Sequence, residues 1–277
     1  MLKLRINKPF DLENTITCGQ IFRFEKKDNS YTIILSDRVI NVFMDKEYLC
    51  VTSNNEEDLE NVIINYFDLN NDYDKIIDEL VKNDKKISNA AIFSKGLKFI
   101  KQEPFETLIE YIISANNGVN NIGNSLNLIA QKYGKKVIFE NKEYYLFPNA
   151  KDLKDVSLED FRNCKVGFRD KYLKEVIYKI NNNEFNLDSL YELDDTEALK
   201  VLMEINGIGP KVASCILLFA YQKYKVFPVD TWVKKIMKSD YNIEGEENIR
   251  RYAKKTYGNY SGIAIQYLFN YSRNNKE

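Results

Sequence analysis

The chain of 277 residues contains no histidine. Histidine is the usual general base near neutral pH and a common metal ligand, so its absence excludes Ser-His-Asp and Cys-His catalysis and any histidine-ligated metal centre. A base or nucleophile in this protein must therefore be a lysine, carboxylate, cysteine or tyrosine side chain, or a backbone group.

Cysteine is scarce. The four cysteines, Cys18, Cys50, Cys164 and Cys215, are widely separated along the chain. Their spacing fits neither a disulfide framework nor a zinc ribbon, and it provides no local ligand set for an iron–sulfur cluster. We therefore expect no metal and no cofactor.

Long apolar runs are also missing, and the first residues show no signal peptide. We expect a cytoplasmic monomer without membrane contact. The 40 basic and 41 acidic residues nearly balance, which argues against a bulk polycation. Phosphates can still be bound by a local basic patch or by helix N-termini, which leave the net charge unchanged.

Two kinds of apolar pattern divide the chain. Alternating, β-branched runs with turn-like breaks predict strands at Gln20–Phe24, Tyr31–Leu35, Val39–Phe43 and Tyr48–Thr52. Helical spacing then predicts helices at Glu57–Phe67, Asp72–Asn83, Ile87–Ile100, Pro104–Ala115, Asn120–Tyr133, Ser189–Met203, Thr231–Lys238, Glu246–Tyr257 and Ser261–Tyr271. The expected fold class is α+β, with an N-terminal antiparallel β-sheet domain at residues 1–100 and a mainly helical region at residues 101–277.

The helical region contains two helix patterns joined by a short turn, Asn206–Pro210. Gly207 and Gly209 allow close backbone approach, and Pro210 suits the first position of a new helix, where its missing N–H is not needed. The pattern predicts a helix-hairpin-helix at about residues 195–220. The N–H groups at the start of its second helix can hold a phosphate whatever the nucleotide sequence.

Three side chains near this hairpin can carry chemistry. Lys211 and Cys215 are four residues apart, so they share one helix face. The positive end of the helix favours the neutral form of the Lys211 amine, which is the nucleophilic form. Asp230 precedes the next helix and can cap it, face the amine, or do both. Taken singly, a solvated lysine, a capping aspartate and a small buried cysteine are the more common interpretations.

The combination of hairpin, lysine and following aspartate resembles the helix-hairpin-helix DNA glycosylase superfamily. The resemblance implies that Lys211 is the nucleophile and Asp230 the catalytic aspartate. It also implies that Gly207 and Gly209 contact the DNA backbone.

Three shorter runs resemble the 8-oxoguanine DNA glycosylases. The run Thr17–Phe24 resembles a Gly-Gln-x-Phe-Arg segment, which implies that the Gly19 carbonyl accepts a hydrogen bond from the N7–H of 8-oxoguanine. Ser114–Asn117 resembles a Ser-x-Asn-Asn loop, which implies that Asn116 fills the gap left by the extruded base. Gly167, Phe168 and Arg169 resemble a Gly-Tyr-Arg motif, so Phe168 corresponds to the wedge and Arg169 to the cytosine-binding arginine.

The final helix completes the resemblance. Phe269 corresponds to the phenylalanine that stacks on the extruded purine, with Cys215 against the other face. Gln266 is one residue away from the position of the family's base-binding glutamine, where Ile265 stands. Trp232 occupies the place of a phosphate-contacting histidine in eukaryotic relatives.

The resemblance implies a bifunctional DNA glycosylase and AP lyase that excises 8-oxoguanine from duplex DNA through a lysine Schiff base. Two alternatives stay open. The same chemistry can act on another damaged base, or the hairpin can belong to a non-catalytic DNA-binding protein. Asn121 stands where cytosine-selective relatives have arginine, so the opposite-base preference is open as well.

Overall fold

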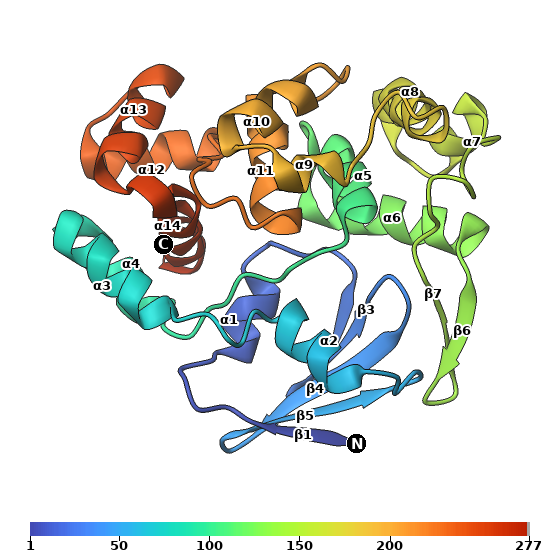
Figure 1. Ribbon diagram of the computed structural model, residues 1–277, viewed down its shortest axis with the longest axis horizontal. Coiled ribbons are helices and arrows are strands. Elements are labelled where there is room, and N and C mark those ends of the chain that lie inside the picture. Colours follow the sequence, from blue (N-terminus) through green and yellow to red (C-terminus); the bar gives the residue numbers. More distant parts are fainter. Residues whose placement is uncertain (276–277) are drawn as a thin grey trace.

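The computed structural model describes residues 1–275. A five-stranded antiparallel sheet forms one side of the molecule, and most of the helices lie beyond it (Figure 1). The strands, in the spatial order β1-β5-β4-β3-β2, are β1 (Leu2–Arg5), β2 (Phe24–Lys27), β3 (Ser30–Ile34), β4 (Val39–Asp45) and β5 (Tyr48–Ser53). A separate hairpin consists of β6 (Lys136–Phe139) and β7 (Lys142–Tyr145).

Helices make up most of the remaining chain. They are α1 (Leu12–Thr17), α2 (Leu59–Tyr66), α3 (Tyr73–Asn83), α4 (Ser88–Phe93), α5 (Pro104–Ser114), α6 (Val119–Tyr133), α7 (Leu158–Asn163), α8 (Asp170–Asn181), α9 (Ser189–Glu192), α10 (Asp195–Met203), α11 (Pro210–Ala220), α12 (Thr231–Tyr241), α13 (Glu246–Thr256) and α14 (Ser261–Asn275). Short 3₁₀ turns lie at Lys85–Ile87, Gly167–Arg169 and Gly258–Tyr260. The predicted α+β class is confirmed.

The sheet buries one face against α1 and α2. Ile33, Val42 and Val51 point into a core that also contains Ile16 of α1 and Ile63 of α2. The register pairs Ile33 with Ile40 and Val42 with Val51, so apolar side chains from neighbouring strands meet on the sheet. This matches the two-residue periodicity of the sequence.

The beginning of the chain differs from the prediction. Strand β1 and helix α1 were not predicted, and the expected strand Gln20–Phe24 is wrong because β2 starts only at Phe24. Gln20 is fully buried and its amide bonds the carbonyls of Thr15, at 2.7 Å, and Lys98, at 2.9 Å. These side-chain bonds tie the segment to α1 and to the chain before α5 instead of to a strand.

The helix predicted at Ile87–Ile100 is also too long, since α4 ends at Phe93. Gly96 adopts φ +86°, and a Cβ atom there would lie 2.7 Å from the Asp11 backbone nitrogen. Asp11 N–H donates to the Gly96 carbonyl at 2.8 Å. The close approach of the two backbone segments needs a glycine and ends the helical path.

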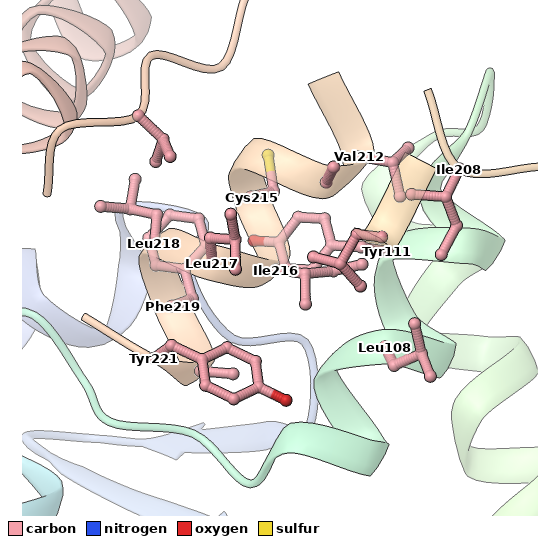
Figure 2. Close-up of a cluster of buried hydrophobic side chains, with 14 of the residues drawn as sticks. Leu108, Tyr111, Ile208, Val212, Cys215, Ile216, Leu217, Leu218, Phe219 and Tyr221 are labelled. Carbon is pink, nitrogen blue, oxygen red and sulfur yellow. The ribbon is translucent and has the colours of Figure 1, made fainter. Parts of the chain in front are cut away.

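The helical core centres on α5 and α11. Val212–Ala220 is buried throughout, and the ring of Tyr111 on α5 stacks on Phe219 of α11 with 5.7 Å between ring centroids. Figure 2 shows Tyr111 and Leu108 of α5 beside the α11 side chains. Tyr73 and other α3 side chains, which lie before residue 100, join the same core. The boundary between two domains at residue 100 remains a prediction. Within residues 1–275, none of the helices is both long and apolar enough to cross a membrane.

Candidate active site

The hairpin turn sits between α10 and α11, as the sequence predicts. Gly207 adopts φ +86°, and a Cβ atom there would lie 2.5 Å from the Tyr172 ring of α8. Gly209 precedes α11, and a Cβ atom there would meet nothing within 4 Å. Gly207 is therefore needed for packing, while Gly209 leaves the N–H groups at the start of α11 open to an approaching anion.

Lys211 lies in the first turn of α11, and its side chain reaches back to α5. The Nζ atom is 3.4 Å from Ser114 Oγ and 5.4 Å from the centroid of the Tyr111 ring. Among residues 1–275, Lys211 takes part in no ion pair. Its amine is therefore oriented by a hydroxyl and an aromatic face rather than by a carboxylate, and it remains available to a substrate.

Asp230 caps α12. Its Oδ1 accepts a hydrogen bond from the Val233 N–H at 2.7 Å, whereas Oδ2 accepts none from the described residues. Asp230 and Lys211 line the same cavity, which has a volume of about 1070 Å³. The carboxylate thus serves as a cap and also faces the space that contains the amine.

This cavity, called the base cavity below, has an apolar side formed by Cys215 and Phe269. Gly19 lies at its edge in a turn after α1, with φ +91°, and a Cβ atom there would be 3.7 Å from Phe269 Cε1. The predicted strand Gln20–Phe24 would put Gly19 at its entrance, but α1 ends two residues before Gly19 and β2 begins five residues after it. Gly19, Cys215 and Phe269 nevertheless come together around one space.

The two thiols near the cavity are not competing nucleophiles. Burial raises the pKa of the Cys215 thiol, although the nearby Lys211 ammonium opposes the shift. Burial also raises the pKa of Cys18 to about 12. Both cysteines are therefore neutral at physiological pH, and neither thiol is a ready nucleophile.

Gln266 also lines the base cavity and is buried, with its Nε2 donating to the Cys18 carbonyl at 3.1 Å. Ile265, which stands at the position of the family's base-binding glutamine, lines the cavity too.

Arg273 also lines the base cavity, and it was not predicted. It follows Phe269 by one helical turn, and its Nη1 is 3.2 Å from where a Gly19 Cβ atom would lie. The four-residue spacing between Phe269 and Arg273 places both side chains on one face of α14, and this spacing could have identified Arg273 from the sequence.

The predicted DNA-contacting residues differ in exposure. Phe168 is 59% exposed and Trp232 40% exposed, as contacts with a large partner require. Asn116 is exposed in a loop with φ +53° and lines the base cavity. Arg169 is buried, and its guanidinium donates to the carbonyls of Ala115, Asn116 and Val166.

Arg169 therefore holds the Asn116 loop in place in this structure, and its base contact stays a prediction. Two further residues that touch Lys211, Tyr111 and Ser114, were not predicted. Tyr111 is indistinguishable by sequence from the apolar residues around it, but Ser114 belongs to the loop motif and could have been found there.

The chain matches two protein-family models that together span most of its length. The model for the 8-oxoguanine DNA glycosylase N-terminal domain matches residues 3–108. The model for HhH-GPD superfamily base excision DNA repair proteins matches residues 109–258.

Relatives agree with these matches. A probable N-glycosylase/DNA lyase of Methanothermobacter thermautotrophicus is 31% identical over 215 residues, covering 69% of this chain and 68% of that protein. An N-glycosylase/DNA lyase of Saccharomyces cerevisiae is 29% identical over 276 residues, covering 89% and 72%. The structure of Clostridium acetobutylicum 8-oxoguanine glycosylase/lyase with double-stranded DNA containing cytosine opposite 8-oxoguanine superposes with a TM-score of 0.93 at 38% identity, covering 99% and 98%.

These matches confirm the predicted family and the predicted enzyme class, a bifunctional DNA glycosylase and lyase, over the alternative of a non-catalytic DNA-binding protein. The chain belongs to the 8-oxoguanine DNA glycosylase/lyase family within the HhH-GPD superfamily of base excision DNA repair proteins.

Proposed function

We propose that this enzyme removes 8-oxoguanine from duplex DNA with Lys211 as nucleophile and then cleaves the strand by β-elimination. One observation carries the proposal. Lys211 and Asp230 open into the same cavity, whose walls include Gly19, Cys215 and Phe269. The cavity thus combines an amine, a carboxylate and two apolar surfaces suited to a planar base.

Base recognition follows from these walls. An extruded purine would stack between Cys215 and Phe269, and the Gly19 carbonyl would accept the N7–H that guanine lacks. Unstacking a base costs a few kcal/mol, which aromatic stacking worth about 1–3 kcal/mol per base helps to offset. An undamaged guanine would present a lone pair to the Gly19 carbonyl, so the site discriminates by one buried hydrogen bond. Gln266 would contact another edge of the base.

The chemistry uses the two ionisable groups in turn. The neutral amine of Lys211 attacks C1′ of the sugar, the C1′–N9 bond breaks, and the base leaves with the bonding electron pair and takes up a proton. The Asp230 carboxylate stabilises the positive charge that develops on the sugar. Opening of the sugar ring gives a Schiff base between Lys211 and C1′, and loss of a proton from C2′ then expels the 3′ phosphate.

DNA binding depends on groups around the cavity. The open N–H groups beside Gly207 and Gly209 would hold a phosphate without regard to sequence. Phe168 would insert as a wedge at the extruded base, and Asn116 would fill the gap with support from Arg169. Trp232, at the start of α12, would lie along the DNA backbone.

The proposal is tested with borohydride and a duplex that contains 8-oxoguanine opposite cytosine. Wild type should give a covalent enzyme–DNA adduct, and Lys211→Gln should give none while it binds the same duplex as tightly. If Lys211→Gln still forms the adduct or cuts the strand, Lys211 is not the nucleophile. Duplexes with an alkylated purine or an oxidised pyrimidine should compete poorly; equal competition would assign the chemistry to another lesion.

A monomeric state and a cytoplasmic location complete the proposal. The single cavity contains all of the proposed catalytic groups of one chain, so catalysis needs no second copy. Sedimentation at the concentration of the assay should give the mass of one chain.

A further inference from the structure

A second cavity of about 380 Å³ lies between the sheet, α2 and α5. We call it the glutamate cavity and define it by Ile21, Ile33, Tyr66, Glu106 and Glu110, which all line it. It shares none of its lining residues with the base cavity. Nothing in the proposed reaction uses it.

Glu110 lies at the buried end of this cavity. It is 3% exposed, and its Oε2 has no hydrogen-bond partner among the described residues. A buried carboxylate without a partner is costly because it has lost its water. Burial, reinforced by the charge of Glu106, raises the pKa of Glu110 well above its ordinary value. Burial therefore favours the protonated, neutral form of Glu110.

Two cationic side chains line the cavity, Arg23 and Lys101, and Arg23 is paired with Glu106. The Nη1 of Arg23 donates to Glu106 Oε1 at 2.7 Å, and its Nε donates to Asn127 Oδ1 at 3.3 Å. Its Nη2 donates to the carbonyl of Tyr145. Arg23 thus pairs directly with Glu106, and although its charge opposes the rise in the Glu110 pKa, none of its hydrogen bonds goes to Glu110.

The other charged or titratable groups around the cavity come from three segments. Asp37, in the turn between β3 and β4, pairs with Arg38. Tyr66 of α2 has a raised pKa, mainly through burial and then through the charges of Glu106 and Glu110. The remaining two groups, Lys101 and Glu103, precede α5, and Glu103 caps that helix. Among the described residues, Glu110 is the acid of this set with a buried oxygen that has no hydrogen-bond partner.

The shape of the cavity indicates the kind of cation. Ile21, Ile33 and Val62 provide apolar walls, and the exposed side chains of Asn65 and Glu103 mark an opening to solvent. A volume of about 380 Å³ is far larger than a metal ion requires. Within residues 1–275, no cluster of three or more cysteine, aspartate or glutamate side chains is arranged to hold a metal. A cation with a hydrocarbon chain fits these features better.

We propose that the glutamate cavity binds a small primary aliphatic amine as its ammonium ion. The ammonium group donates hydrogen bonds to the Glu110 carboxylate and the Tyr66 hydroxyl, and the carbon chain packs on Ile21, Ile33 and Val62. Binding ionises Glu110, so one proton leaves the protein for each amine bound. Such amines stay protonated below about pH 10, so within that range a rise in pH favours binding through the ionisation of Glu110.

The test is an NMR titration of the full chain with n-butylamine, followed through the methyl resonances of Ile21 and Ile33. We expect saturable shifts and tighter binding at pH 8 than at pH 6. 1-Butanol, which has the same chain and no charge, should bind at least about tenfold more weakly, since a charge-assisted hydrogen bond is lost.

Glu110→Gln keeps the shape of the side chain and removes its charge, and it should weaken n-butylamine binding by at least about tenfold and abolish the pH dependence. Glu79→Gln, which changes an exposed glutamate on α3, is the matched control and should bind as wild type does. The proposal is overturned if wild type shows no saturable shifts, if 1-butanol binds equally well, or if Glu110→Gln binds as tightly as wild type.

Discussion

Helix α5 lines two cavities of opposite character. Its C-terminal half contributes Tyr111 and Ser114 to the base cavity, where the Lys211 amine has no carboxylate paired with it in the described structure. Glu106 and Glu110, nearer its N-terminus, line the glutamate cavity, where Glu110 Oε2 has no hydrogen-bond partner among the described residues. Lys211 is partly buried, whereas Glu110 is buried.

The comparison shows that an unpaired charged group can be tolerated in two ways. Lys211 keeps partial contact with solvent, and its Nζ also contacts a hydroxyl and an aromatic face. Glu110 has lost its water and avoids the cost by staying protonated. We therefore expect substitutions in the base cavity to change the chemical step and substitutions in the glutamate cavity to change stability.

The largest effect is expected from Asp230→Asn. Removing the charge that stabilises the sugar cation should slow single-turnover excision of 8-oxoguanine by about 10²–10³-fold. Asparagine can still cap α12 through the Val233 N–H, so the free energy of unfolding should change by less than about 0.5 kcal/mol. An excision rate within twofold of wild type would mean that Asp230 serves only as a helix cap.

Glu106→Gln should have the next largest effect, on stability. The Arg23 side chain is 3% exposed, and losing its charged partner should lower the free energy of unfolding by about 2 kcal/mol. Glu25→Gln is the matched control because the Glu25–Lys142 pair is exposed, and its effect should stay below about 0.5 kcal/mol. Denaturant unfolding measures both; equal losses would show that burial of the pair does not matter.

Glu110→Gln should act in the opposite direction, with a dependence on pH. The folded-state pKa of Glu110 is raised, so the folded state keeps a proton that the unfolded chain releases above about pH 4.3. Wild-type stability due to this group is complete below that pH and is lost as the pH rises toward the folded-state pKa. Relative to wild type, the variant should therefore become progressively more stable as the pH rises above about 4. A gain independent of pH would mean that Glu110 is not titrating.

The smallest effect is expected from Ser114→Ala. The hydroxyl contacts Lys211 Nζ at 3.4 Å, which is a weak hydrogen bond, so excision should slow by about two- to threefold. The change should appear in the single-turnover rate and in its dependence on pH, and Ser114→Thr should restore both. A loss larger than that of Asp230→Asn would mean that the hydroxyl takes part in the chemistry.

Much of the base cavity was predictable because its residues follow local rules. The glycine-rich turn and Pro210 fix the start of α11, four-residue spacing puts Lys211 and Cys215 on one face, and a carboxylate before a helix predicts the Asp230 cap. These features depend on a few neighbouring residues, so they are visible in the sequence.

The remaining features depend on tertiary contacts. Gly19 lies in a turn rather than at a strand because buried bonds of Gln20 hold the segment against α1. Arg169 is turned inward by carbonyls that are more than fifty residues away in sequence. Glu110 stands in an apolar helix, and its lack of a partner appears only when the sheet and α2 are packed against it.

The most direct test of the reaction is to locate the covalent bond. Wild-type enzyme and the 8-oxoguanine duplex are reduced with borohydride, digested with protease and nuclease, and the modified peptide is sequenced by mass spectrometry. We predict that the sugar remnant is attached to Lys211. Attachment to any other lysine, or to the N-terminal amine, would contradict the assignment of this side chain as the nucleophile.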